Sequence, residues 1–171
     1  MIDKLINPGI LPNDCHNKLK ELEKCGKLKA IVTQNIDGLH EMAGSKNVIT
    51  IHGTIYKNHC INCNKEFDLD YVMNYKNNIP TCTCGGIIKP NVVLYNEPLN
   101  NDDVMKAIKY ISEADTLIVG GTSLNVYPAA GLINYFKGKN LIIINKEKLN
   151  TPCTLQINEP IGKVFKQIKI D

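Results

Sequence analysis

The sequence predicts an α/β fold: a parallel sheet covered by helices on both faces, with a small metal-binding insert. Short apolar runs alternate with segments of helical periodicity, an alternation typical of parallel sheets. The middle of the chain breaks this alternation, because it carries four cysteines, several asparagines and little apolar periodicity. The chain has 171 residues, of which 43% are hydrophobic and 22% charged, as expected for one domain plus an insert.

The first part of the chain predicts two helices and two strands. Residues 13–28 place apolar side chains at helical spacing behind a capping Asn13 or Asp14. Gly26 ends this helix, since glycine commonly adopts the left-handed conformation that follows a helix. A buried strand at 28–34, a short helix at 37–43 closed by Gly44, and a second strand at 48–52 follow in that order.

The α/β pattern returns after residue 100. Val104, Ile108 and Ile111 share one face of a helix at 101–113, with Asn101 or Asp102 as its cap. Further elements are expected as follows: continuous apolar strands at 115–121 and 140–145, a weaker strand at 154–157, and helices at 128–136, with Pro128 in its first turn, and at 162–168. The predicted larger domain therefore comprises residues 1–53 and 92–171, and the zinc-binding insert residues 54–91.

Charge and hydropathy narrow the expected partners. The net charge of +3 is small and evenly spread, so neither a nucleic acid nor a membrane surface is expected. No apolar run approaches the roughly 20 residues of a membrane helix. The N-terminus has no apolar signal region, so the expected location is cytoplasmic. All 20 basic residues are Lys, so an anion site would have to use Lys, backbone N–H groups or a helix N-terminus.

Four of the seven cysteines form two close pairs that predict a zinc site. Two residues separate Cys60 from Cys63, and one residue separates Cys82 from Cys84. The odd number of cysteines argues against a disulfide framework, whereas two such pairs suit tetrahedral thiolate coordination. Four thiolates leave no open position on the metal, so the ion would be structural. The alternatives are four reduced thiols without a metal, or His59 as a rival ligand.

Polar side chains follow the first two predicted strands, at the edge where parallel sheets bind their ligands. Gln34, Asn35, Ile36 and Asp37 come directly after the first strand, and His52 ends the second. Such a cluster is costly unless it is hydrogen-bonded, so it either caps the short helix at Asp37 or binds a polar ligand. A neutral His52 could accept a proton from a hydroxyl there, although a lone histidine is more often structural.

A second polar group follows the strands of the second part. Gly121, Thr122 and Ser123 come after the strand at 115–121, where glycine lets the backbone approach a phosphate and the hydroxyls donate to it. Asn145 and Lys146 follow the strand at 140–145. This signal is weak by itself, because many strand-to-loop turns look similar and the dinucleotide pattern GxGxxG is absent from the chain.

Together these segments resemble the sirtuin family, the NAD-dependent protein-lysine deacylases, and most of all its bacterial branch. The matching segments are TQNIDGLH at 33–40, IHG at 51–53, the two cysteine pairs, Lys89–Glu97, GTSL at 121–124, and Ile144 with Asn145. They occur in the order and spacing of the family. The resemblance implies a Rossmann-like parallel sheet, braced by a small zinc ribbon.

The resemblance also implies a function: NAD-dependent removal of acetyl groups from protein lysine, giving nicotinamide and O-acetyl-ADP-ribose. His52 would be the general base. Gln34, Asn35, Ile36 and Asp37 would line the nicotinamide and ribose end of NAD, Gly121, Thr122 and Ser123 would hold phosphate and ribose, and Asn145 and Lys146 the adenosine end. The acetylated peptide would add as a strand between two segments. The residues expected to bind it are Val93, Tyr95 and Asn96 on one side and Leu124, Asn125 and Val126 on the other.

The sequence departs from the family at its start. Sirtuins begin with a further segment that carries a Gly-Ala-Gly phosphate loop on a first, central strand and a Pro-Asp-Phe-Arg run, and this sequence has neither. Without that strand, the strands at 28–34 and 115–121 would each keep an unpaired edge. Lys89 and Asn96 are smaller departures, and we expect both to be tolerated.

Three outcomes of the missing strand are considered. In the first, which we favour, the chain is a truncated product with poor activity. In the second it is completed by an N-terminal chain or by self-association, and in the third its strands close up into a different sheet. The alternative function is a zinc-stabilised module that binds peptide or nucleotide without turnover, and a poorly folded remnant is the third reading.

Overall fold

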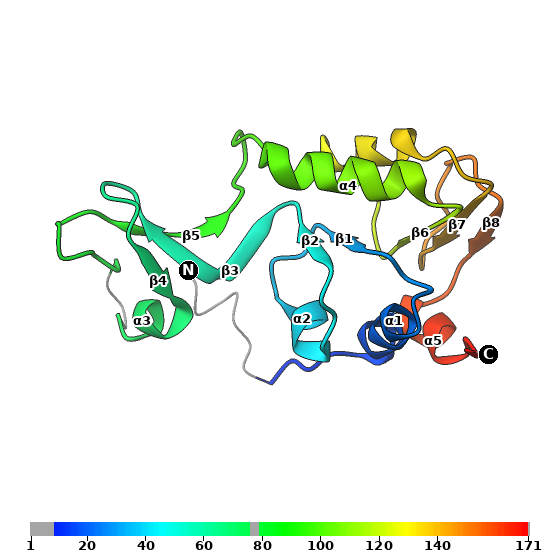
Figure 1. Cartoon of the computed structure of the whole chain (residues 1–171), viewed down its shortest axis with the longest axis horizontal. Helices are drawn as coiled ribbons and strands as arrows, with labels where there is room; N and C mark the ends of the chain where they lie inside the picture. The colour runs from blue at the N-terminus through cyan, green and yellow to red at the C-terminus, as the bar shows by residue number, and fades with distance from the viewer. Residues whose placement is uncertain (1–8, 76–78, 171) are drawn as a thin grey trace.

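A computed structural model describes residues 9–75 and 79–170, and its elements follow an α/β order interrupted by an antiparallel insert (Figure 1). Residues 1–8 and 171 of the predicted larger domain and residues 76–78 of the predicted insert lie outside the described residues. The elements are α1 (Asp14–Lys24), β1 (Ile31–Thr33), α2 (Leu39–Ala43), β2 (Val48–Thr50), β3 (Gly53–Cys60), β4 (Glu66–Asp68), α3 (Leu69–Met73), β5 (Ile88–Val92), α4 (Asn101–Glu113), β6 (Thr116–Gly120), the 3-10 helix η2 (Ala129–Tyr135), β7 (Asn140–Ile144), β8 (Leu155–Ile157) and α5 (Ile161–Lys166).

The start of α1 is fixed by a reciprocal cap that involves Asn13, one of the two predicted capping residues. The Asn13 side chain accepts hydrogen bonds from the backbone N–H groups of Cys15 and His16, at 2.9 and 3.3 Å. The His16 ring in turn accepts from the Asn13 backbone N–H at 3.2 Å. This exchange satisfies donors that every helix N-terminus leaves free.

Two expectations about helix starts in the second part were wrong. The cap of α4 is Asn100, whose side chain accepts from the Asp103 N–H at 3.1 Å, and not Asn101 or Asp102. The helix predicted at 128–136 is present as the 3-10 helix η2, but Pro128 is its N-cap rather than a first-turn residue. In both cases the sequence carries suitable residues at neighbouring positions, so only the backbone path decides between them.

The insert has more regular structure than its sequence predicts. β3 pairs antiparallel with both β4 and β5, and α3 packs against β3 and β4. Its buried core consists of Cys60, Val72, Cys82 and Ile88, with Phe67 and Tyr71 packed against it. Two of the four core residues are therefore predicted metal ligands, which explains why the apolar periodicity of this segment is weak.

The larger part of the structure contains two separate pieces of parallel sheet. β1 pairs with β2, and β6, β7 and β8 pair in that order. Within residues 9–75 and 79–170, β1 and β6 each pair on one side only, so the expected unpaired edges are present and the strands do not close up into a different sheet. The continuous apolar strand predicted at 115–121 therefore has one unpaired edge, and its Ile118 is 40% exposed.

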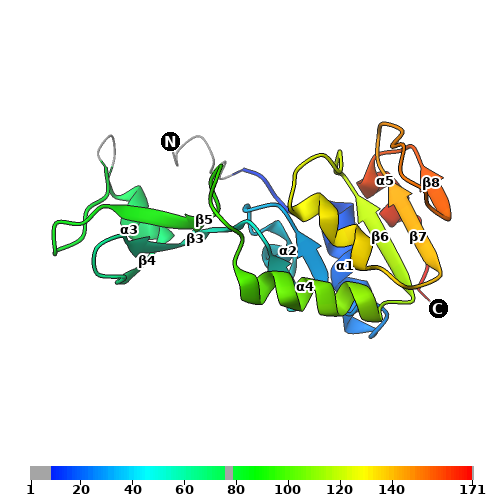
Figure 2. The ribbon, with the colours of Figure 1, turned by 90° about the horizontal axis from the view of Figure 1, so that it is seen from above.

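Helices cover both faces of these sheets. α4 lies across both pieces of sheet (Figure 2), and its Ala107 and Ile111 form one core with Ile49, Ile51, Ala129 and Leu132. On the other face, α1 and α5 pack on β7 and β8 around the buried ring of Phe165. This arrangement agrees with the predicted sheet covered on both faces. In the described part of the chain, no helix is both long and apolar enough to span a bilayer.

Candidate functional site

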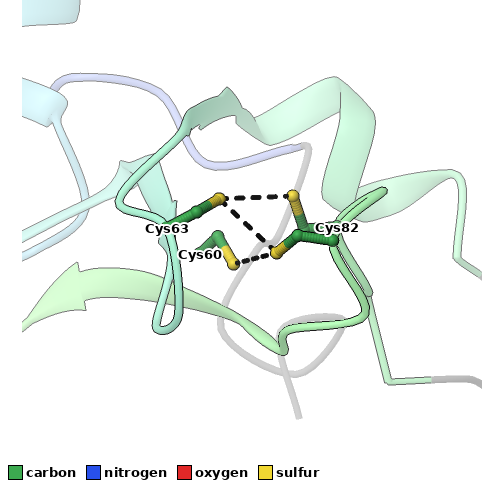
Figure 3. Close-up of side chains that lie close together, drawn as sticks. Cys60, Cys63 and Cys82 are labelled. Atoms are coloured by element: carbon green, nitrogen blue, oxygen red, sulfur yellow. Dashed lines mark hydrogen bonds between the residues drawn. The ribbon is translucent and has the colours of Figure 1, made fainter.

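The four paired cysteines meet at the end of β3, as the sequence predicts. Figure 3 shows the thiols of Cys60, Cys63 and Cys82 turned toward one another, and the Cys84 sulfur completes the group. The Sγ–Sγ distances are 3.5 Å for Cys60 to Cys84, 3.7 Å for Cys63 to Cys82 and 3.5 Å for Cys63 to Cys84. Four sulfurs at about 2.3 Å from a tetrahedral zinc ion would lie about 3.8 Å apart. The cluster therefore fits a structural zinc ion.

The backbone around the cluster favours thiolates. The N–H of Asn62 donates to the Cys60 sulfur at 3.4 Å. A hydrogen bond from the backbone N–H of Cys84 lowers the pKa of the Cys82 thiol to about 6. A Cβ at Gly86 would lie 2.6 Å from the Cys60 sulfur, so this position requires glycine. The rival ligand His59 lies outside the cluster, because its Nδ1 contacts the Asn91 side-chain oxygen.

His52 lies in the turn between β2 and β3 and is held by the backbone on two sides. Its Nδ1 is 3.0 Å from the Gln34 carbonyl oxygen. A carbonyl oxygen can only accept, so Nδ1 carries the hydrogen and the neutral ring has its acceptor at Nε2. The His52 carbonyl accepts from the Val93 N–H at 3.0 Å. The structure thus brings together His52, the predicted residue Gln34 and the start of the predicted peptide-binding segment.

Asn35 and Asp37 form a local network after β1. Asp37 Oδ1 accepts from the Leu39 N–H at 3.0 Å, and Asp37 Oδ2 lies 3.4 Å from the amide of Asn35. The predicted capping role of Asp37 is therefore present, although the residue at the N-cap position of α2 is Gly38. Ile36, between them, accepts from the Ile55 N–H through its carbonyl at 3.3 Å.

The second predicted group lines a cavity of about 820 Å³ at the carboxyl ends of β6 and β7. Gly121, Thr122, Ser123, Asn145 and Lys146 all border it. Gly121 has a φ of +62°, and no atom lies within 4 Å of where its Cβ would be, so no side chain blocks the approach of a ligand here, although its N–H is donated to the Ile144 carbonyl at 3.1 Å. The structure therefore assembles this group as expected, but the cavity lining includes none of the predicted residues at 34–37 or His52.

Other residues at this cavity were not predicted from the sequence. Asp14 at the start of α1 and Lys163 and Lys166 of α5 also line it. Lys166 pairs at 3.6 Å with Asp14, which also lines the cavity, and Lys163 pairs at 2.9 Å with Glu159, which does not. The spacing of Glu159 and Lys163, four residues apart on a helix start, was the only signal of these pairs in the sequence.

The predicted peptide-binding residues lie on two exposed segments. After β5, the side chain of Tyr95 is 99% exposed, and Asn96 has a φ of +69°. In the other segment, Leu124 has a φ of +54°, and Thr122 Oγ1 accepts from its N–H at 3.1 Å. Val126 is half exposed, and Asn125 precedes it in the same loop.

The fold and these sites define a class: an α/β protein with a strand-end cavity and a four-cysteine zinc module inserted between its strands. A model of the Sir2 family matches residues 1–128. The chain belongs to this family. A Clostridium tetani protein named NAD-dependent protein deacetylase is 54% identical over 168 residues, which cover 95% of this chain and 67% of the relative. A Clostridium perfringens protein of the same name is 56% identical over 169 residues, covering 96% and 69%.

Solved structures agree with this assignment. The structure described as "Sir2-p53 peptide-NAD+" matches with a TM-score of 0.86 at 36% identity and covers 92% of this chain and 68% of that chain. The structure described as "Sir2 bound to acetylated peptide" matches with the same TM-score and identity, over 91% and 68%. This chain thus spans about two thirds of the length of these relatives.

Proposed function

We propose that this protein removes acetyl groups from lysine side chains of proteins in an NAD-dependent reaction. The observation that carries the proposal is the orientation of His52. Its Nδ1 is bonded to the Gln34 carbonyl, so among the described residues its Nε2 is left to accept a proton at the sheet edge where parallel sheets bind their ligands. The curated relatives named NAD-dependent protein deacetylase support the same conclusion.

The residues of the strand-end cavity suit part of NAD. A cavity of about 820 Å³ is within the usual range for small-molecule sites. Thr122 and Ser123 offer hydroxyl groups for phosphate and ribose, Gly121 leaves room for the ligand beside them, and Asn145 and Lys146 border the same space for the adenosine end. With no arginine in the chain, the phosphate charge would be met by Lys146 and backbone N–H groups.

The residues after β1 and β2 would bind the nicotinamide and ribose end of NAD, where the reaction takes place. When bound, NAD supplies a ribose carbon that accepts the acetyl oxygen as nicotinamide leaves. His52 Nε2 would take the proton of a ribose hydroxyl, and the Gln34 carbonyl would stabilise the resulting imidazolium through Nδ1. Asn35, Ile36 and Asp37 line this end, and the bonds of Asp37 to Leu39 and Asn35 keep its carboxylate in one orientation.

The acetylated peptide would bind as an added strand. Val93, Tyr95 and Asn96 would offer backbone on one side, and Leu124, Asn125 and Val126 on the other. Recognition through backbone would admit many sequences around one acetyl-lysine. We further propose that the larger domain is 1–53 with 92–171 and the zinc module 54–91, and that the protein is cytoplasmic, where cysteines stay reduced and free to bind zinc.

The test measures nicotinamide release and peptide deacetylation by the zinc-loaded chain with NAD and an acetyl-lysine peptide. Loss of the general base in His52→Ala should lower the rate by about 100-fold or more, while Lys106→Ala, on the exposed face of α4, should leave it unchanged. Calorimetry should show NAD binding that Asp37→Ala weakens. Equal nicotinamide release from wild type and His52→Ala would overturn the proposal, and saturable peptide binding without turnover would favour a binding module.

A further inference from the structure

The segment after β5 ends in a turn that is closed by two hydrogen bonds, one between backbone groups and one to a side chain. The Glu97 N–H donates to the Leu94 carbonyl at 3.0 Å, as in a β-turn, and Asn96 at the third position has a φ of +69°. Positive φ at this position is what a type II turn requires, and asparagine tolerates it better than other side chains. The Glu97 side chain also reaches back, because its Oε2 accepts from the Leu94 N–H at 2.9 Å.

An ion pair connects this turn to the zinc module. Glu97 Oε1 pairs with Nζ of Lys89, which lies on β5. Lys89 is itself held in the ladder opposite His59 of β3, next to Cys60. One carboxylate therefore bonds simultaneously to the first residue of the turn and to a strand of the module, with one oxygen for each.

The turn is also adjacent to the proposed general base. Val93, which directly precedes the turn, donates its N–H to the His52 carbonyl at 3.0 Å. The backbone of residues 93–97 is thus anchored at one end on His52 and at the other on Lys89. Between these anchors the side chain of Leu94 is half exposed and that of Tyr95 almost fully exposed, so apolar packing contributes little to the shape of the turn.

We infer that Lys89 and Glu97 are positioning residues for the peptide substrate, because their ion pair fixes the turn at 94–97 so that residues 93–96 present one backbone conformation beside His52. This inference rests on the proposed deacetylase function. The side chains of Lys89 and Glu97 are 28% and 39% exposed, so water weakens the pair, and its effect on peptide binding should be moderate. The Lys89 ammonium also lowers the pKa of the Glu97 carboxyl, which keeps it ionised.

The kinetic test separates peptide binding from the rest of the reaction. Glu97→Ala removes both bonds and should raise the KM for acetyl-peptide about tenfold. Lys89→Ala removes only the ion pair and should raise it about threefold. Lys89→Arg keeps the charge and should stay within about twofold of wild type. In all three, kcat and the KM for NAD should change less than about twofold, and Lys106→Ala, which removes an exposed lysine from the α4 pair with Asp103, is the matched control.

A second measurement does not depend on turnover. Amide exchange of Leu94 by NMR should become several-fold faster in Glu97→Ala and remain near wild type in Lys106→Ala. Unchanged Leu94 exchange, or a peptide KM within twofold of wild type in Glu97→Ala, would overturn the inference. A wild-type chain that releases no nicotinamide would refute the proposed function instead. In that case, weaker binding of a labelled acetyl-peptide to Glu97→Ala, measured by fluorescence anisotropy, would support the pair and equal binding would overturn it.

Discussion

Gly86→Ala should disrupt the zinc site by a steric displacement that can be worked out from the structure. The new Cβ would lie 2.6 Å from the Cys60 sulfur, whereas ordinary contacts begin at 3.4 Å. Relief of the overlap requires the sulfur to move by about 0.8 Å, and metal sites tolerate ligand displacements of only about 0.2 Å. Cys60 is fully buried in the core of the insert, so its side chain has little room to move as a unit with the metal.

The expected result is a loss of at least tenfold in zinc affinity, equivalent to about 1.4 kcal/mol. Competition with a chromophoric chelator measures this affinity directly, and the d–d absorption of the cobalt-substituted protein reports whether four sulfurs still bind. Asn62 would also lie too close to the new Cβ, with its Cγ at 2.8 Å and its Cβ at 2.9 Å, so the backbone between Cys60 and Cys63 would have to shift as well and add to the displacement of the ligands.

Gly85→Ala is the matched control, because no atom lies within 4 Å of the Cβ that it would add. Gly85 has a φ of +83°, so this change should cost about 1–2 kcal/mol of folding stability through backbone strain while the sulfurs keep their places. An unchanged zinc affinity and an unchanged cobalt spectrum in Gly86→Ala would refute the steric argument. A larger loss of affinity in Gly85→Ala than in Gly86→Ala would do the same.

Three further outcomes are expected. Phe165→Ala should lower the free energy of unfolding in urea by about 3–5 kcal/mol, because the ring is 1% exposed between α1, α5 and β7; a change below about 1 kcal/mol would contradict this packing. A chelator should accelerate amide exchange in β3 and β5 and leave α1 and α5 protected, since the ligands Cys60 and Cys82 are half of the insert's buried core; uniform acceleration would contradict it. Burial lowers the pKa values of His16 and His40 below 6.5, so both favour the neutral form when folded. Their contribution to stability is then complete above pH 6.5 and is lost as the pH falls through the lowered values. The Tm of wild type relative to His40→Asn should therefore fall from pH 7.5 to 5.5, and a constant difference would argue against this.

Much of the larger domain could be predicted because its pattern is local. The apolar runs of β6 and β7 and the periodicity of α4 identify these elements without knowledge of their neighbours. The zinc ligands were predictable for the same reason, since the spacing of Cys60 and Cys63 is a property of one short turn. Boundaries were less certain, and the strand expected at 28–34 contains only three paired residues, Ile31–Thr33, because its extent depends on the partner strand β2.

What could not be predicted depends on contacts between distant segments. β3 and β5 were missed because their pairing is set by the cysteine cluster rather than by an apolar alternation. The ion pair of Lys89 and Glu97 joins residues whose sequence spacing belongs to no regular element, and the pair of Asp14 and Lys166 at the cavity joins opposite ends of the chain. Electrostatic partners of this kind become visible only once the backbone path is known.

The division of the parallel sheet into two pieces affects how the polar residues after β2 and those after β6 are aligned along the strand direction. Within one ladder, hydrogen bonds fix the register of neighbouring strands in whole residues. Between β1 and β6 of the described structure there is no ladder, and the core of α4, η2 and β2 is what connects them. Apolar contact has no preferred register, so the alignment of His52 with Gly121 depends continuously on the volumes of side chains such as Ala107 and Leu132. Substitutions in that core should therefore change the distance between His52 and Gly121 in small steps. A strand hydrogen-bonded to both β1 and β6 would instead restrict this distance to the values that whole-residue registers allow.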